Sequence, residues 1–390
     1  MKKKVLAVML SAMVAAAALT GCSSSGSDTS SEEDATEEEA VAGEESGEEA
    51  AEEETVEEEA EDTADEEAAE EEAAETVVYK VGIVQYMDHA SLNQITENIE
   101  TELDAKGEEL GVTFEYEDYF INGQGDSTVI SQGLAQLKDD GVDIVVCVAT
   151  PTATAAQSTF EDTDTPIVFA AVSDPVGAGL VDSMEEPGGN ITGTSDEFSA
   201  ETLLNLAFAA DPDADKIGLL YSTSEDSSIQ SIADAKAYLD ELGIEYVEKT
   251  GTSTTEVSQA VDALIAEGVD AIFTPSDNTV MSAELSIYEK LIEAGIPHYA
   301  GADSFALNGA FVGFGVSYIE LGLETGDVVV DILVNGEDPA AYSVVTFENG
   351  IVTINTETCE ALGLDLAAVE AAFEDYCTEI VETVTAEEFE

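Results

Sequence analysis

A short stretch of sequence occurs twice in this chain, and its two copies constrain the fold more than any other feature. The first copy, residues 141–156 (GVDIVVCVATPTATAA), opens with a continuous apolar run that is typical of a strand buried on both faces. The threonines and proline that follow favour the start of a helix. The second copy, residues 268–283 (GVDAIFTPSDNTVMSA), has the same order. Each copy predicts a helix N-terminus at the carboxyl end of a parallel strand, where open α/β sheets bind small anions.

Two neighbouring segments repeat in the same order. Residues 80–84 are echoed by residues 216–220, and residues 165–169 are echoed by residues 296–299. Counting the two copies described above, three pairs of segments repeat. Within each pair the second segment follows the first by 127 residues for the copies, 136 for residues 80 and 216, and 131 for residues 165 and 296. We therefore expect two similar α/β halves, each a parallel sheet flanked by helices, whose strand ends face a shared cleft.

Acidic residues dominate the composition and are densest between residues 23 and 76, where 26 acidic residues occur and no basic one. The whole chain has a formal net charge of -77 and contains no arginine. A surface of this charge repels nucleic acid, so we expect no nucleic-acid partner. Residues 23–76 also lack aromatic side chains and cannot form a core, which predicts a disordered acidic tether, with a single long helix near residues 55–75 as the alternative.

The first 22 residues have the pattern of a secretory signal. Three lysines, residues 2–4, precede an apolar run, residues 5–18, that is too short to span a bilayer as a mature helix. Residues 19–22 (LTGC) match a bacterial lipobox. This motif predicts a lipid anchor on Cys22 and a location on the outer face of the cytoplasmic membrane. A cleaved signal with an incidental cysteine is the alternative.

The rest of the chain, from residue 77 onward, alternates between predicted strands and helices. The glycine-rich residues 188–194 predict the first crossing between the two halves, and residues 317–335 predict a long amphipathic helix with a glycine at its end. Residues 343–347 and 351–355 predict a hairpin across residues 348–350. Residues 367–390 are acidic, and we expect them to form a peripheral tail.

Four segments at predicted strand ends carry a family resemblance: residues 84–92 (VQYMDHASL), 149–155 (ATPTATA), 171–176 (AVSDPV) and 275–280 (PSDNTV). In this order, behind a lipobox, they resemble the ABC-transporter substrate-binding lipoproteins of the tryptophan/tyrosine type, which have the type I periplasmic-binding-protein fold. The resemblance covers roughly residues 77–366.

The resemblance implies two Rossmann-like lobes joined by a multi-crossover hinge that closes over the ligand. On this basis we expect lobe 1 to comprise residues 77–192 and 316–342, and lobe 2 residues 193–315 and 343–366. The resemblance also implies an ABC permease and its ATPase as partners. The implied ligand is a small molecule, an amino acid that is often aromatic.

Residues that could hold an amino acid fall in the predicted strand-end loops. The ligand carboxylate needs donors, and because arginine is absent we expect a helix N-terminus and hydroxyls to supply them. These donors are expected at Thr150, Thr152, Ala153 and Thr154, for which a plain helix cap is the alternative.

The ligand ammonium group needs a carboxylate. The candidates that follow predicted strands are Asp174 with the adjacent Ser173, Asp196, Asp277 and Asp303. Asp277 and the adjacent Asn278 rank first, because the repeat places them opposite Thr152.

The first strand-end loop adds Gln85, Tyr86 and His89, of which His89 could instead serve as a helix cap. Tyr221 and Phe305 are further candidates for the wall of the cleft.

The cysteines and histidines indicate no metal chemistry. Cys147 lies in a predicted core strand, and Cys359 and Cys377 could pair or remain free. The two histidines, His89 and His298, form no metal-ligand pattern with the cysteines, and we expect no metal or cofactor.

Four classes of function remain to be weighed. A lipid-anchored solute receptor for an ABC importer fits the residues, whereas an enzyme lacks support, since the chain has no Gly-x-Ser-x-Gly elbow, dinucleotide loop, P-loop or zinc motif. A receptor for a membrane signalling partner and a type I receptor for nucleosides, sugars or another small metabolite are the alternatives.

Overall fold

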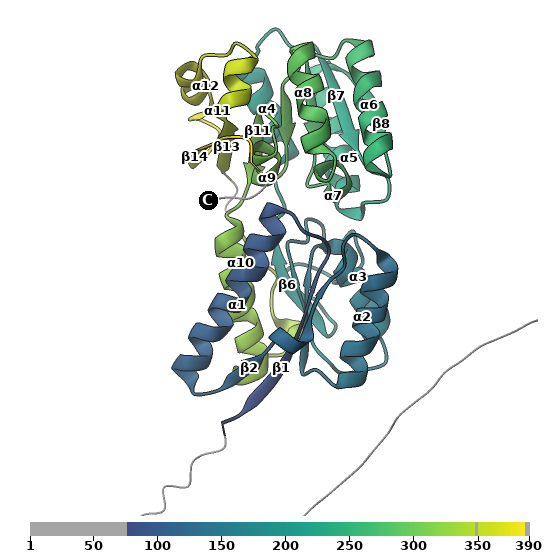
Figure 1. Ribbon diagram of the computed structural model, residues 1–390, viewed down its shortest axis with the longest axis vertical. Helices are drawn as coiled ribbons and strands as arrows, with labels where there is room; N and C mark the ends of the chain where they lie inside the picture. Colours follow the sequence, from purple (N-terminus) through teal and green to yellow (C-terminus); the bar gives the residue numbers. More distant parts are fainter. Residues whose placement is uncertain (1–75, 348–349, 387–390) are drawn as a thin grey trace, which may run out of the picture. The chain divides into compact units, whose positions relative to one another are not determined.

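Two seven-stranded sheets form the framework of the protein (Figure 1). The computed structural model describes residues 76–347 and 350–386, all of which belong to one compact unit. The predicted anchor on Cys22 and the acidic tether lie outside the described residues. Within the described ranges, no helix has the length and apolar character needed to cross a bilayer.

The first sheet, which defines lobe 1, is parallel throughout and has the order β12-β6-β5-β4-β1-β2, with β3 also paired to β1. Its strands are β1 (Val78–Gln85), β2 (Thr113–Glu115), β3 (Phe120–Asn122), β4 (Ile144–Val148), β5 (Ile167–Ala170), β6 (Ile191–Ser195) and β12 (Val345–Thr346). Every residue of β4 is buried, as expected for a strand covered on both faces.

Helices cover both faces of this sheet. Helices α1 (Ala90–Leu110) and α10 (Tyr318–Val330) pack together on one face, and α2 (Ser127–Asp140) and α3 (Thr150–Phe160) pack together on the other (Figure 1). A π-helical turn, η2 (Asp331–Asn335), extends α10 to Gly336, where the long helix was expected to end. The short 3-10 turns are η1 (Glu117–Tyr119) and η3 (Pro339–Ala341).

The second sheet, which defines lobe 2, has the order β14-β13-β11-β10-β9-β7-β8 and is parallel except where β11 meets β13. Its strands are β7 (Lys216–Tyr221), β8 (Glu245–Thr250), β9 (Ala271–Thr274), β10 (His298–Ala300), β11 (Val312–Gly315), β13 (Ile351–Asn355) and β14 (Glu379–Thr383). Its helices are α4 (Ala200–Ala210), α5 (Asp226–Leu242), α6 (Thr254–Glu267), α7 (Asn278–Met281), α8 (Glu284–Ala294), α9 (Asp303–Leu307), α11 (Thr356–Ala361) and α12 (Leu366–Phe373).

The repeated sequence has the same structural role in both lobes. The glycine that opens each copy ends the preceding helix, α2 or α6, in the left-handed conformation, with φ of 65° and 69°. Asp143 Oδ2 then accepts from the backbone N–H of Lys80 at 2.8 Å, and Asp270 Oδ2 accepts from that of Lys216 at 2.9 Å. The Nζ of each lysine donates to a carbonyl in the last turn of that helix. The expectation of two similar halves is confirmed by this match.

In the part of the chain that the structure describes, the backbone crosses between the lobes three times, after β6, after β11 and after β12. The first crossing falls after Ser195, because residues 191–195 extend the first sheet by pairing with β5. The predicted hairpin between residues 343–347 and 351–355 is wrong. Val345 and Thr346 pair with the edge strand β6 of lobe 1, whereas β13 pairs antiparallel with β11 of lobe 2.

Residues 367–386 are an integral part of lobe 2, so the expected peripheral tail is wrong for them. Val369 and Phe373 of α12 are buried, and the Phe373 ring lies 6.5 Å from that of Phe311. Strand β14 then pairs with β13 at the end of the sheet. Cys359 and Cys377 are free thiols, so the possible pairing between them is not formed.

Candidate binding site

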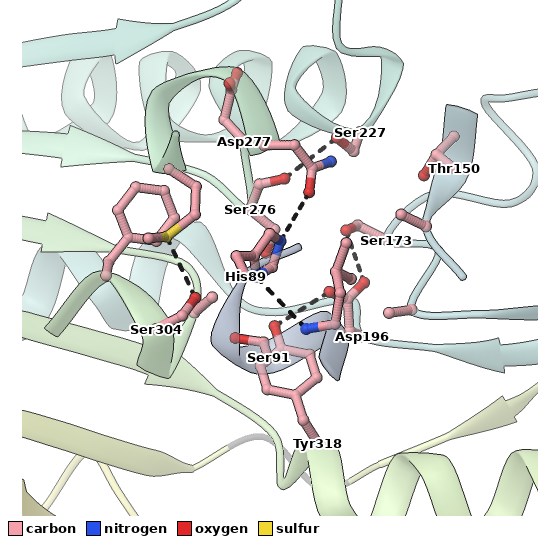
Figure 2. Close-up of a pocket in the computed structure, with 17 residues that line it drawn as sticks. His89, Ser91, Thr150, Ser173, Asp196, Ser227, Ser276, Asp277, Ser304 and Tyr318 are labelled. Atoms are coloured by element: carbon pink, nitrogen blue, oxygen red, sulfur yellow. Dashed lines mark hydrogen bonds between the residues drawn. The ribbon is translucent and has the colours of Figure 1, made fainter. Parts of the chain in front are cut away.

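A pocket lies between the two lobes, at the carboxyl ends of their strands (Figure 2). Its empty volume, including space open to solvent, is about 410 Å³. Lobe 1 and its crossovers contribute His89, Ser91, Leu92, Ala149, Thr150, Ala171, Ser173, Asp196 and Tyr318. Lobe 2 contributes Ser227, Ser276, Asp277, Asn278, Met281, Ala302, Ser304 and Phe305.

Two alanines in strained conformations form part of the pocket wall. Ala149 follows β4 with φ 81°, and Ala171 follows β5 with φ 54°. Non-glycine residues rarely adopt positive φ, and such strain concentrates at ligand sites. At Ala149 the chain turns abruptly from β4 into α3, which places the first residue of the helix, Thr150, at the pocket.

The predicted donors at the start of α3 divide into two groups. Thr150 lines the pocket, as do the first-turn residues Ser91 and Leu92 of α1. Thr152 is fully buried, and its hydroxyl donates to the carbonyls of residues 148 and 149 at 2.9 and 2.7 Å. Thr154 donates in the same way to the carbonyls of residues 150 and 151, and Ala153 is buried against the core. Thr152, Ala153 and Thr154 therefore lie outside the pocket.

Asp196 is a buried carboxylate in the pocket, at the first crossing between the lobes. Its Oδ1 accepts from Ser173 Oγ at 2.8 Å, and its Oδ2 accepts from the Tyr318 hydroxyl at 3.3 Å (Figure 2). Burial raises the pKa of this carboxyl, although both hydrogen bonds favour its charged form. Among the described residues no lysine lines the pocket, and the chain has no arginine. Asp196 therefore faces the cavity without a cationic side chain of the protein.

Asp277 also lines the pocket, but its oxygens are occupied within lobe 2. Its Oδ2 accepts from Ser222 N–H at 2.6 Å and from Ser228 Oγ at 2.7 Å. Its Oδ1 accepts from Val280 N–H at 2.9 Å, which caps α7. Burial raises the pKa of Asp277.

The other two candidate carboxylates lie outside the pocket. Asp174 accepts from Gly177 N–H at 2.7 Å within its own loop. Asp303 accepts from Ser91 Oγ at 2.8 Å, and burial raises the pKa of Asp303 to about 6. Because Ser91 begins α1 of lobe 1 and Asp303 begins α9 of lobe 2, this hydrogen bond joins the lobes.

His89 is the N-cap of α1, the alternative role expected for it, where Leu92 N–H donates to Nδ1 at 3.5 Å. It also lines the pocket. Its Nε2 lies 3.2 Å from Asn278 Oδ1 across the cleft (Figure 2). Burial lowers the pKa of His89 to about 4, so the ring is neutral at pH 7.

Three other predicted residues lie outside the pocket. The Gln85 side chain is buried, where it donates to Met87 O and accepts from Thr96 Oγ1. The Tyr221 hydroxyl donates to Glu248 Oε2 at 3.0 Å on β8, and Tyr86 is half-buried beside the first loop.

Sequence reasoning missed several pocket residues, of which Tyr318 is the clearest example. It is the first residue of α10, directly after the second crossing, and its N-cap Ser317 was the available signal. Phe305, a weaker candidate, lines the pocket together with Met281 and Leu92. In the part of the chain that the structure describes, no group of His, Cys, Asp and Glu side chains could hold a metal ion.

The two lobes, their three crossovers and the pocket between them define a periplasmic binding protein of type I. Residues 80–370 match the family described as ABC transporter substrate binding protein. The chain belongs to this family, whose members are extracytoplasmic binding proteins rather than enzymes.

Two similar proteins are described by the amino acid that they bind. A "Tyrosine-binding protein" from Clostridioides difficile (strain R20291) is 32% identical over 284 residues, which cover 73% of this chain and 81% of the relative. An ABC domain from Streptococcus pneumonia, solved in complex with L-Trp, is 31% identical with a TM-score of 0.70, covering 78% of this chain and 99% of that chain.

Two further solved structures are similar to this chain. The ligand-free, open structure of a substrate binding protein from Clostridium difficile is 30% identical and covers 79% of this chain and 100% of that chain, but its TM-score is 0.60. A glucose-galactose binding protein from Geobacillus stearothermophilus, 16% identical with a TM-score of 0.52 over 70% of this chain and 96% of that chain, shares the fold.

Proposed function

We propose that this protein is a lipid-anchored extracytoplasmic receptor that binds an aromatic amino acid and delivers it to an ABC importer. One observation carries the choice of ligand. The pocket combines a buried carboxylate without a cationic protein partner, Asp196, with the N-termini of two long helices, α1 and α3. A zwitterion carries the two charges that these groups would bind.

The ligand ammonium group is assigned to Asp196. Asp277 was ranked first from the sequence, but its oxygens already accept three hydrogen bonds within lobe 2. Asp196 is instead oriented by Ser173 and Tyr318, which leaves its charge available to a ligand cation.

The ligand carboxylate is assigned to the first turns of α1 and α3. Leu92 N–H and Thr152 N–H already donate to His89 Nδ1 and Ala149 O, and Pro151 has no N–H. The donors proposed for the ligand are therefore at the first residues of the two helices, where Ser91 and Thr150 line the pocket. The apolar and aromatic side chains of Leu92, Met281 and Phe305 would contact an aromatic side chain. The similarity to a domain solved in complex with L-Trp and to a tyrosine-binding protein supports this class of ligand.

Binding is proposed to close the lobes by motion at the three crossovers, and the closed form would dock on the permease of an importer. The anchor would be a lipidated Cys22, with residues 23–76 as the tether. A Cys22→Ala variant should leave the membrane fraction and lose incorporation of a labelled fatty acid. A variant that stays in the membrane would contradict the anchor.

Ligand binding can be measured directly, because the chain contains no tryptophan and the fluorescence of L-Trp reports its own binding. We expect L-Trp, L-Tyr or L-Phe to raise the free energy of unfolding, by about 2.7 kcal/mol at a hundred times Kd. Tryptamine lacks the carboxylate and indole-3-propionate lacks the ammonium group, and each should bind at least about tenfold more weakly. Binding of nucleosides or sugars instead of amino acids would overturn the proposal.

A further inference from the structure

Glu225 is a buried carboxylate that lies outside the pocket and that the sequence did not single out. It is 2% exposed and precedes α5 as the N-cap residue. Its side chain does not cap that helix. Both of its oxygens are directed at α7, where Asn278 Nδ2 donates to Oε2 at 3.2 Å and Thr279 Oγ1 donates to Oε1 at 3.1 Å.

The hydrogen bond to Glu225 fixes the orientation of the Asn278 side chain. Above its pKa of about 7 the Glu225 carboxylate is mostly ionised and only accepts hydrogen bonds, so the amide nitrogen of Asn278 faces Glu225. The amide oxygen, Oδ1, is then directed across the cleft at His89 Nε2, 3.2 Å away.

His89 completes a chain of hydrogen bonds with a single direction. Its Nδ1 accepts from Leu92 N–H at the start of α1, so the ring must carry its proton on Nε2. That proton is donated to Asn278 Oδ1. The chain therefore runs from Leu92 N–H through His89 and Asn278 to Glu225, and every donor along it meets an acceptor.

We propose that Glu225 is a positioning residue that orients Asn278 and, through it, His89, and so stabilises the contact of the two lobes around the pocket. It acts without touching the ligand. This inference rests on the proposed function for its effect on affinity, because a contact between the lobes favours the ligand-bound arrangement.

Three variants, two at Glu225 and one at Asp226, separate the positioning role of Glu225 from the effect of removing a negative charge near α5. Glu225→Ala removes the acceptor, so Asn278 is free to rotate. Glu225→Gln keeps an acceptor oxygen for Asn278, and its NH₂ can donate to the Thr279 hydroxyl, so the direction of the chain survives. Asp226→Ala removes an exposed negative charge at the same helix end and is the matched control.

The first readout requires no ligand. Histidine labelled with ¹⁵N gives ring signals from His89 and His298 alone, because the chain has two histidines. In the full-length chain at pH 7.5, we expect His89 as a single Nε2–H tautomer, also in Glu225→Gln and Asp226→Ala. In Glu225→Ala the Nε2–H signal of His89 should shift, because its acceptor Asn278 Oδ1 is no longer held in place, while the signals of His298, which lies against Glu284 and Thr274, stay unchanged. His89 signals that are identical in Glu225→Ala and the parent would overturn the inference.

The second readout is the affinity for L-Trp. Glu225→Ala should raise Kd about tenfold, as expected for the loss of about one hydrogen bond across the cleft, with Glu225→Gln restoring most of the affinity. In an Asn278→Ala background, Glu225→Ala should change Kd less than about twofold, because the side chain through which Glu225 acts is absent. An undiminished tenfold effect in that background would show that Glu225 acts by another route. If no variant binds L-Trp while the His89 signals respond as expected, the ligand assignment fails and the positioning role stands.

Discussion

The Tyr318 hydroxyl donates to Asp196 Oδ2 at 3.3 Å, although the two residues are 122 positions apart in the chain. Asp196 follows β6 at the first crossing between the lobes, and Tyr318 begins α10 after the second. The two crossings therefore meet at the pocket, and the carboxylate proposed to hold the ligand is supported by a residue of another crossing.

Asp196→Asn should weaken amino-acid binding. The substitution keeps the size of the side chain but removes the charge proposed to face the ligand ammonium group, which corresponds to a loss of about 1.5–3 kcal/mol, or more than about tenfold in Kd. Isothermal titration with L-Trp measures the effect. Asp174→Asn, which alters a carboxylate outside the pocket, is the control, and equal affinities of the two variants would exclude Asp196 as the ammonium ligand.

Thr152→Val should leave the affinity within about twofold of the parent. The Thr152 hydroxyl donates to backbone carbonyls within lobe 1 and does not reach the pocket. We expect a loss of about 1 kcal/mol in the free energy of unfolding, from the missing hydrogen bond. Urea denaturation and ligand titration together check this prediction, and a large rise in Kd would instead place Thr152 at the ligand.

Asp277→Ala should destabilise the protein strongly. The carboxylate accepts from two backbone N–H groups and from Ser228 Oγ, and its removal leaves these donors unpaired in a buried position. We expect a loss of about 2–4 kcal/mol, measured by urea denaturation. Ser228→Ala removes one of the three donors and should cost less. A stable Asp277→Ala protein with weak ligand binding would return Asp277 to the role of ammonium ligand.

Glu225→Gln should change the pH dependence of stability. Burial and the neighbouring carboxylates of Asp277 and Asp226 raise the pKa of Glu225 from 4.5 to about 7. The native parent therefore binds an extra proton between these values, and the stability from this group is present below pH 4.5 and lost as the pH rises through about 7. The variant lacks this titration, so its stability relative to the parent should increase by up to about 3 kcal/mol from pH 4.5 to pH 7.

Urea denaturation of the two proteins across this range provides the measurement. His89, whose pKa is lowered, and Asp303, whose pKa is raised, titrate in both proteins and largely cancel in the difference. A stability difference that stays constant from pH 4.5 to pH 7 would contradict a buried, shifted Glu225.

The α/β class and the two similar halves could be predicted from the amino-acid sequence. The continuous apolar run of β4 indicates a buried strand, and the repeated glycines mark the ends of the helices before it and before β9. The repeated aspartate and lysine form the same contacts in both lobes. Local patterns of this kind also placed His89, Thr150, Ser173, Asp196, Asp277 and Asn278 at strand ends, and the structure brings these residues together at the pocket.

Which polar groups face the pocket depended on the tertiary structure. The hydroxyls of Thr152 and Thr154 donate to carbonyls one turn back, and the Asp277 carboxylate accepts from Ser222, which follows β7, and from Ser228 of α5. The pairing of β12 with β6 and of β14 with β13 likewise depends on which sheet edge is open. The hydrogen-bond partner of each side chain and the pairing of each edge strand depend on groups that are far apart in the chain. These distant groups compete with nearby backbone groups for the same hydrogen bonds, and a local sequence pattern does not show which of them is bound.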